Sequence, residues 1–273
     1  MLTKIFAPII QRTPALKRTI WKRWYEFLAR GYKQDDWTFM NYGFAETGEG
    51  AARLPLEAGD EADRFSIQLY HRVVGGIDLT GRDVLEIGSG RGGGAAYVAK
   101  YLHPRSVLGV DYSDQAVALS AKRHSAPGLR FAQGDAEALP SATGSFDAVL
   151  NVESSHCYGS MDRFLGEVAR VLRPGGYFLW ADMCGPSERE TIRQQFRNAG
   201  LEIVADTNIT ANVVLALDGA TEQKRKTISQ FVPKFLRGYF EDFAGVQGTR
   251  VYESLRRRDV EYWCCALRKP EAG

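Results

Sequence analysis

The feature that most constrains the fold is a glycine-rich segment, residues 83–94, which begins with a short apolar run. Val84, Leu85 and Ile87 predict a buried strand, and the apolar pattern that starts at Ala95 predicts a helix directly after a tight turn. The first turn of such a helix presents free backbone N–H groups to a ligand above it. The segment therefore predicts an α/β fold with a ligand site at this turn.

The glycine spacing alone leaves the ligand open. Gly88, Gly90 and Gly93 match the G-x-G-x-x-G pattern of dinucleotide-binding proteins, so an NAD-dependent oxidoreductase is one alternative. Glu86 argues against it, because a carboxylate near the turn repels a pyrophosphate. The same carboxylate suits a ligand with a positive charge, hydroxyl groups and no phosphate. S-adenosylmethionine has these three properties.

From residue 82 onward, short apolar runs alternate with helical patterns, as in βαβ units with a parallel sheet. Asp111 follows the second predicted strand (107–110), and Asp135 follows the third (129–133). Ligands bind at the carboxyl ends of the strands in open α/β sheets. Asp111 is thus placed to accept hydrogen bonds from ribose hydroxyls. Asp135 either accepts from an adenine amine or caps a turn.

Composition excludes several classes of function. A net charge of +2 argues against nucleic acid as a partner. The four cysteines form no C-x-x-C motif, so we expect neither a metal site nor a disulfide framework. No apolar run approaches the roughly 20 residues of a membrane span, so we expect no stable membrane insertion. These features predict a soluble, cytoplasmic protein.

We divide the chain into an N-terminal helical arm or lid, residues 1–75, and a catalytic domain, residues 76–273, with a helical insertion at 210–248. The arm begins with a basic stretch that carries aromatic residues. Three interpretations of the arm are open: it packs on the rest of the protein as an amphipathic helix, it closes over a site of this or a neighbouring subunit, or it contacts a membrane surface. Its aromatic residues predict subunit contacts, and hence a homo-oligomer.

Five segments, taken in this order, resemble class I S-adenosylmethionine-dependent methyltransferases: Glu86–Gly90, Asp111, Gly134–Ala136, Asn151 and Leu172–Gly176. The resemblance implies a Rossmann-like, seven-stranded, mostly parallel sheet with helices on both faces and an antiparallel last strand. It also implies S-adenosyl-L-methionine as cofactor and S-adenosyl-L-homocysteine as product. The residues expected around the cofactor are Glu86, Gly88, Ser89, Gly90, Asp111, Tyr112, Asp135, Ala136 and Asn151.

Further segments resemble the mycobacterial phthiotriol/phenolphthiotriol dimycocerosate methyltransferases and related actinobacterial natural-product methyltransferases. They are Leu54–Ala58, Leu69–Arg72, Asn151–Tyr158 and Gly245–Thr249. The resemblance implies a small apolar acceptor: a lipid, a polyketide or a terpenoid. The mycobacterial enzymes carry Cys and His where this chain has Ser89 and Arg91, so the identity of their acceptor is not transferred.

The type of acceptor decides which residues are catalytic. A hydroxyl acceptor needs a general base, and His156 is our candidate, with Glu153 as its orienting partner or as an alternative base. A structural histidine is the simpler interpretation of His156.

A prenyl double bond instead needs a stabilised carbocation, for which aromatic faces and the charge of Glu153 are suitable. The aromatic residues expected to face the substrate are Tyr25, Tyr42, Phe44 and Tyr158. A third possibility is a non-catalytic protein of this fold whose basic arm docks to a membrane or a synthase.

Overall fold

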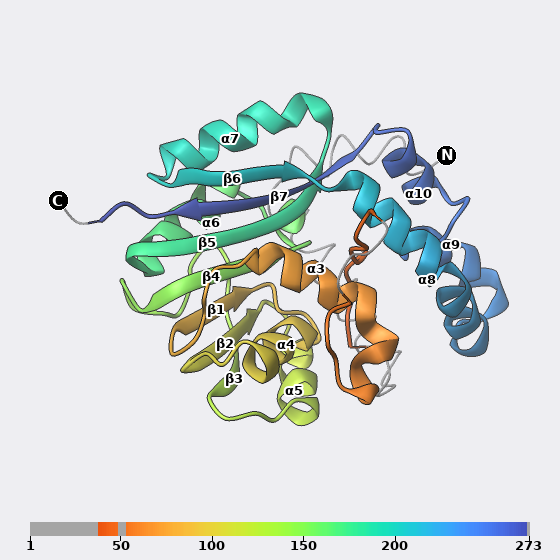
Figure 1. Ribbon diagram of the computed structural model, residues 1–273, viewed down its shortest axis with the longest axis horizontal. Coiled ribbons are helices and arrows are strands. Elements are labelled where there is room, and N and C mark those ends of the chain that lie inside the picture. The colour runs from red at the N-terminus through yellow and green to blue at the C-terminus, as the bar shows by residue number, and fades with distance from the viewer. Residues whose placement is uncertain (1–37, 49–52, 272–273) are drawn as a thin grey trace.

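The computed structural model describes residues 38–48 and 53–271. Within them, one sheet has the strand order β3-β2-β1-β4-β5-β7-β6 (Figure 1). The strands from β3 to β5 pair in parallel, and β7 pairs antiparallel with both β5 and β6. This confirms the predicted seven-stranded, Rossmann-like sheet with an antiparallel last strand. The strands are β1 Asp83–Ile87, β2 Ser106–Asp111, β3 Leu129–Gln133, β4 Phe146–Val152, β5 Leu172–Cys184, β6 Glu202–Asn208 and β7 Glu261–Arg268.

Helices lie on both faces of the sheet, and a helical group lies beyond its end (Figure 1). The α-helices are α3 Arg64–Val74, α4 Gly93–Tyr101, α5 Asp114–Arg123, α6 Met161–Val171, α7 Arg189–Asn198, α8 Thr210–Phe231, α9 Arg237–Phe243 and α10 Arg250–Arg256. Short 3₁₀ turns are η1 Ala58–Asp63, η2 Ser155–Cys157, η3 Pro186–Glu188 and η4 Lys234–Leu236. The helical segment between β6 and β7 therefore continues past residue 248, where we expected it to end, to Arg256.

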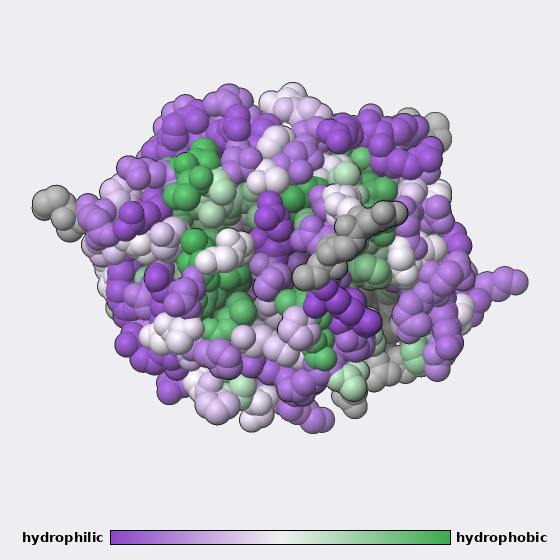
Figure 2. Space-filling view, in the orientation of Figure 1, coloured by the Kyte–Doolittle hydropathy of each residue, from purple (hydrophilic) through white to green (hydrophobic). Residues whose placement is uncertain are grey.

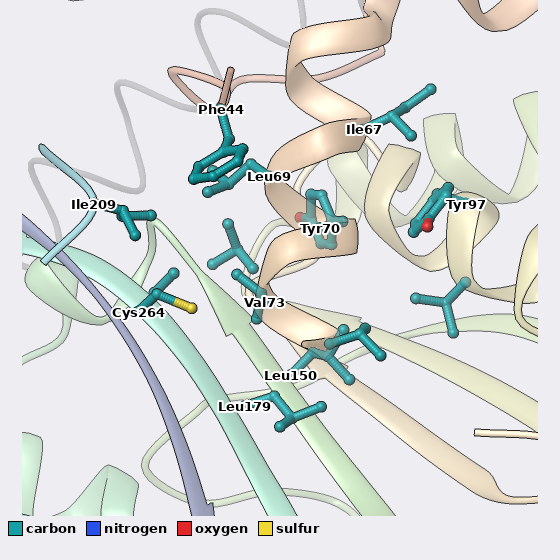
Figure 3. Packing of buried hydrophobic residues seen from close by; sticks show 14 of the residues in the cluster. Phe44, Ile67, Leu69, Tyr70, Val73, Tyr97, Leu150, Leu179, Ile209 and Cys264 are labelled. Atoms are coloured by element: carbon teal, nitrogen blue, oxygen red, sulfur yellow. The ribbon is translucent and has the colours of Figure 1, made fainter. Parts of the chain in front are cut away.

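The protein has two hydrophobic clusters, one on each face of the sheet, because successive strand residues point to opposite faces. Val84 of β1 belongs to one buried cluster and Leu85 to the other. The first cluster fills the space beneath α3, where Leu69 lies beside Phe44 and Leu150 of β4 lies beside Leu179 (Figure 3). The second lies beneath α6 and α7 and includes the fully buried Phe164. Burial on both faces fixes the register of the central strands.

The N-terminal part of the chain contributes to this core. α3 lies within the predicted arm, residues 1–75, yet Leu69 is fully buried against the sheet. The helix ends at Gly75, whose φ of 61° is left-handed, so the predicted boundary coincides with a helix-ending turn. Residues 1–37, including the first aromatic cluster and Tyr25, lie outside the described residues.

The surface in the view of Figure 1 is mostly hydrophilic, and apolar surface gathers over the strands beside α3 (Figure 2). Among the residues that the structure describes, no helix has both the length and the apolar character required to span a bilayer.

The carboxyl ends of β1, β2, β4 and β5 meet at one edge of the sheet. An acidic residue stands at or next to each of these ends: Glu86, Asp111, Glu153 and Asp182. A parallel sheet therefore gathers into one place four carboxyl groups that are far apart in the sequence.

Candidate active site

A cavity opens at this edge of the sheet. Its walls are the glycine turn after β1, the ends of β2, β3 and β4, the extended segment 38–42, and single residues of β5 and α9. Most of the predicted site residues line it: Gly88, Ser89, Gly90, Asp111, Tyr112, Asp135, Ala136, Glu153, His156, Tyr42 and Tyr158. The structure thus brings most of the predicted cofactor residues and both predicted catalytic residues to a single cavity, whereas Glu86 and Asn151 do not line it.

The glycine turn is shaped by left-handed backbone conformations, with φ of 74° at Gly88 and 51° at Gly90. The Gly88 and Ser89 N–H groups both donate to the Val110 carbonyl, over 2.8 and 3.1 Å, which ties the turn to the end of β2. A Cβ atom at Gly88 would overlap the side chain of Ser154. Both the conformation and the space therefore require glycine at this position.

Glu86 lies behind the turn and is 2% exposed. Its Oε1 accepts a hydrogen bond from the Tyr70 hydroxyl over 2.6 Å, whereas its Oε2 is buried without a partner among the described residues. Burial raises the pKa of this carboxyl to about 8. A buried carboxyl with one unused oxygen is suited to receive a cationic group, because an opposite charge offsets the cost of its ionisation.

Asp111 closes the turn from the other side. One of its carboxylate oxygens accepts from the Gly90 N–H over 2.8 Å and the other from the Ser113 N–H over 2.9 Å. Burial raises its pKa. Each carboxylate oxygen has a second acceptor site, so Asp111 can still bind ligand hydroxyls from the cavity wall.

Asp135 caps a turn, which is one of the two roles considered for it, and its role toward adenine stays a prediction. Its Oδ1 accepts from the Glu137 N–H over 2.9 Å, which caps a turn. The residue also lines the cavity together with Ala136.

Asn151 is fully buried and braces the site rather than lining the cavity. Its Nδ2 lies 2.9 Å from the Ile87 carbonyl, 2.7 Å from the Ser154 hydroxyl and 2.9 Å from the Tyr158 hydroxyl. The Tyr158 ring in turn packs edge-on against Phe164, with the ring centroids 4.8 Å apart. Asn151 therefore holds the end of β1 and the loop after β4 in a fixed relation.

His156 forms a hydrogen-bonded pair with Asp182, which lies two residues before the end of β5. The imidazole Nδ1 lies 2.7 Å from Asp182 Oδ1, and the His156 N–H donates to Asp182 Oδ2 over 3.0 Å. Ser155 also donates to this carboxylate, over 2.6 Å. The Asp182 side chain is 1% exposed and the His156 side chain 28%. Burial opposes the charge of the imidazole, but the charge of Asp182 outweighs it, so the pKa of His156 lies well above its usual range.

Glu153 contacts segment 38–42, which we call the covering segment, whereas Asp182 is the carboxylate that orients His156. Glu153 Oε1 accepts from the Tyr42 N–H over 2.7 Å and from the Tyr262 hydroxyl over 2.8 Å. The residue has a left-handed φ of 49°, which turns its side chain back toward the cavity at the end of β4. Burial raises its pKa to about 7.

Phe44 does not line the cavity, although we expected it to face the substrate. It is 3% exposed and packs in the core near Leu69 and Ile209 (Figure 3). Its N–H donates to the Phe65 carbonyl over 2.9 Å, which fixes the segment against α3. Gly43, between Tyr42 and Phe44, has a left-handed φ of 87°, so the two side chains do not follow the alternation of an extended chain. The backbone hydrogen bond to Phe65 places Phe44 in the core.

Three residues of the site were missed in the sequence: Tyr70, Asp182 and Tyr262. A signal existed for Asp182, because it is the last residue of the fifth predicted strand (177–182). The two tyrosines carried no local signal, since each reaches its carboxyl partner from an element distant in the sequence.

A family model described as a methyltransferase domain matches residues 85–180. The phthiotriol/phenolphthiotriol dimycocerosates methyltransferase of Mycobacterium tuberculosis is 41% identical over 250 residues, which cover 92% of this chain and 92% of that protein. The fatty-acid O-methyltransferase of Mycolicibacterium smegmatis is 38% identical over 246 residues, which cover 90% and 88% of the two chains.

Solved structures share the fold at lower identity. The geranyl diphosphate C-methyltransferase of Streptomyces coelicolor, in complex with Mg²⁺, geranyl diphosphate and S-adenosyl-L-homocysteine, matches with a TM-score of 0.65 and 16% identity. The match covers 93% of this chain and 98% of that one.

Proposed function

Because this chain belongs to the S-adenosylmethionine-dependent methyltransferases, we propose that it O-methylates a small apolar lipid, polyketide or terpenoid, with His156 as the general base. The enzyme class and the cofactor follow from the family, which replaces the oxidoreductase alternative. The names of the relatives, a phthiotriol/phenolphthiotriol dimycocerosates methyltransferase and a fatty-acid O-methyltransferase, support a lipid-type acceptor.

The residues present fit the cofactor. When bound, S-adenosylmethionine supplies an electrophilic methyl group on a positively charged sulfur. The unpartnered Oε2 of Glu86 suits an ammonium group, and the glycine turn lets the backbone approach a ligand closely. Asp111 offers acceptor sites for ribose hydroxyls, and Asp135 with Ala136 lines the part of the cavity proposed for adenine.

The observation that carries the proposal is the pair of His156 and Asp182 at the cavity wall. The hydrogen bond from Nδ1 to Asp182 fixes the ring, and Cys157 also contacts the His156 side chain. With Nδ1 protonated, Nε2 is the nitrogen of the neutral imidazole that can accept a proton. Asp182 also stabilises the imidazolium that forms when His156 takes a proton from the acceptor hydroxyl. Methyl transfer is an in-line displacement, so the remaining task of the residues is alignment and exclusion of water.

The wall on the same side of the cavity supports an apolar acceptor. Met40 and Tyr42 come from the covering segment, Met183 from β5 and Phe243 from the end of α9. Methionine side chains adapt to irregular apolar ligands. We propose that the arm and the insertion together form the lid of this site.

The test combines a labelled-methyl assay with a histidine variant. Protein, methyl-labelled S-adenosylmethionine and an extract of apolar metabolites are incubated, and the product is separated by phase and identified by mass spectrometry. We expect His156→Gln to bind S-adenosylhomocysteine normally and to turn over about 100-fold more slowly or worse. His103→Gln, at an exposed loop position, is the matched control. Unchanged turnover in His156→Gln would remove His156 from the mechanism.

C-methylation of a prenyl double bond is the alternative. Tyr42 and Tyr158 line the cavity beside the buried Glu153, an arrangement able to stabilise a carbocation. A methyl group on carbon in the product favours this alternative over O-methylation. Cofactor binding without label in any fraction would favour a non-catalytic protein.

We further propose that the protein is a cytoplasmic homo-oligomer with subunit contacts through the N-terminal arm and no nucleic-acid partner. Static light scattering at micromolar concentration measures the mass. A monomer under these conditions would contradict the subunit contacts.

A further inference from the structure

The helical insertion ends in a projecting tip, which we define as residues 223–240. It comprises the last part of α8, η4 and the first part of α9, at the edge of the molecule beyond the sheet (Figure 1). Phe235 of η4 is 85% exposed, and Tyr239 of α9 is 54% exposed. Both belong to the few large apolar side chains exposed among the described residues.

The insertion tip is internally well packed, so this exposure is not that of a loose loop. Ile228, Val232, Phe240 and Val246 form a small separate core within the insertion. The Arg237 guanidinium donates to the Val232 carbonyl over 3.0 Å and to the Ser229 carbonyl over 2.6 Å, which satisfies the end of α8. The fold thus presents Phe235 outward from a braced support.

The charged residues within the insertion tip are all basic, and Glu222, Glu241 and Asp242 flank it in the sequence. Five basic residues and no acidic residue occur between positions 223 and 240. Lys226 and Lys234 are exposed, and neither forms an ion pair with another described residue. This edge of the molecule is hydrophilic in Figure 2. An exposed aromatic side chain among basic ones is complementary to an anionic lipid surface, where the ring enters the interface and the ammonium groups meet phosphates.

We propose that the insertion tip docks the enzyme on an anionic phospholipid bilayer. Phe235 enters the interface, and Lys226 and Lys234 bind the headgroups. α9 begins at this tip and ends at Phe243, which lines the cavity. Docking therefore places the acceptor side of the cavity near the membrane in which an apolar acceptor dissolves. This purpose rests on the proposed function, whereas the docking itself is measurable without methyl transfer.

The test is flotation of the full chain with vesicles of phosphatidylcholine, with and without 30% phosphatidylglycerol. We expect binding to the anionic vesicles that falls sharply at 0.5 M salt, because screening weakens surface charge interactions. Phe235→Ala should weaken binding about tenfold or more. The double variant Lys226→Ala/Lys234→Ala should weaken it roughly 25-fold, since each charge near an anionic surface contributes about fivefold.

Matched controls remove similar groups elsewhere. Lys122→Ala/Arg130→Ala removes two exposed charges at the opposite end of the sheet, and Val204→Ala removes an exposed apolar group of β6. Both should bind like the unsubstituted protein. Equal binding by the tip variants and these controls overturns the proposal and directs attention to the basic N-terminal arm. A change of mass in Phe235→Ala without a change in vesicle binding also overturns it, because Phe235 then contacts a second copy.

Methyl transfer separates this failure from failure of the proposed function. A water-soluble short-chain acceptor should be methylated equally by the unsubstituted protein and Phe235→Ala, whereas an acceptor embedded in anionic vesicles should react more slowly with the variant. Absence of transfer to every acceptor, with vesicle binding intact, refutes the proposed function alone. Equal rates on embedded acceptor overturn the role of docking in delivery.

Discussion

We predict that Glu86 loses a proton when the cofactor binds, and this proton can be counted. Burial raises the pKa of its carboxyl to about 8, so at pH 6.5 most of the free enzyme carries the protonated form. The carboxyl must ionise to pair with an ammonium group of the ligand. We therefore expect binding to expel the proton into solvent.

The expected magnitude follows from the same pKa. At pH 6.5, binding of S-adenosylhomocysteine should release about one proton per site. Because the proton bound below pH 8 opposes binding, affinity should rise about tenfold per unit between pH 5.5 and 7.5. Glu86→Gln keeps the shape but cannot ionise. It should bind roughly 10- to 100-fold more weakly at pH 8, the scale of a lost charged hydrogen bond, with a difference that shrinks as pH falls.

Isothermal titration calorimetry in two buffers of different ionisation enthalpy measures the released protons. Glu153→Gln is the control, because it removes another buried carboxyl of raised pKa that is bound to Tyr42 and Tyr262 rather than placed behind the glycine turn. This control should retain the release. Equal heats in both buffers for the unsubstituted protein, or an unchanged proton count in Glu86→Gln, would refute the reasoning.

Three further expectations concern stability and pH. The pKa of Glu153 is about 7 in the folded protein and 4.5 in the unfolded chain, so between these values only the native state holds the proton. The free energy of unfolding should therefore fall by up to about 3 kcal/mol as pH rises through this range. Thermal unfolding of Glu153→Gln should lack this decline, and identical pH curves for the two proteins would contradict the prediction. Gly94→Ala places a Cβ against the Tyr70 ring and should lower the free energy of unfolding, measured in urea, by about 1–3 kcal/mol. Gly166→Ala, whose Cβ meets open space in α6, should raise the free energy of unfolding by up to about 1 kcal/mol. Equal effects of the two substitutions would exclude this packing argument. Because Asp182 raises the pKa of His156, turnover should increase with pH until the imidazole is neutral, and His156→Gln should lose that increase; a pH profile shared by both proteins would count against the base.

The sheet was predictable because its signals are local. Short apolar runs recur along the sheet, a glycine turn follows the first of them, and an acidic residue stands at or near the end of each. The limits of strands moved by a few residues. The fifth strand, expected from Tyr177, already begins at Leu172, because Leu172 pairs with Phe146 across the sheet. Such pairing depends on the neighbouring strand and leaves no mark in the local pattern.

A site residue was predictable where its position at the end of a strand determines where its side chain lies. It was not predictable where packing against a distant element determines this. Asp111 and Ala136 follow strands and line the cavity as expected. Phe44 stands in an aromatic cluster whose pattern does not distinguish core from cavity, and contact with α3 draws it inward. Glu153 reaches Tyr262 across 109 positions, a contact that depends on β7 lying next to β5.

The position of β7 also has a consequence for how the molecule assembles. β6 is synthesised before β7 but pairs with no other strand among the described residues. The parallel part of the sheet, through β5, can form from a chain that ends before residue 202, whereas β6 must wait for at least 53 more residues to be made. The same late strand supplies the Tyr262 hydroxyl to Glu153. Closure of the sheet and completion of the cavity are thus one event, so an incompletely synthesised chain has a glycine turn but no finished acceptor side.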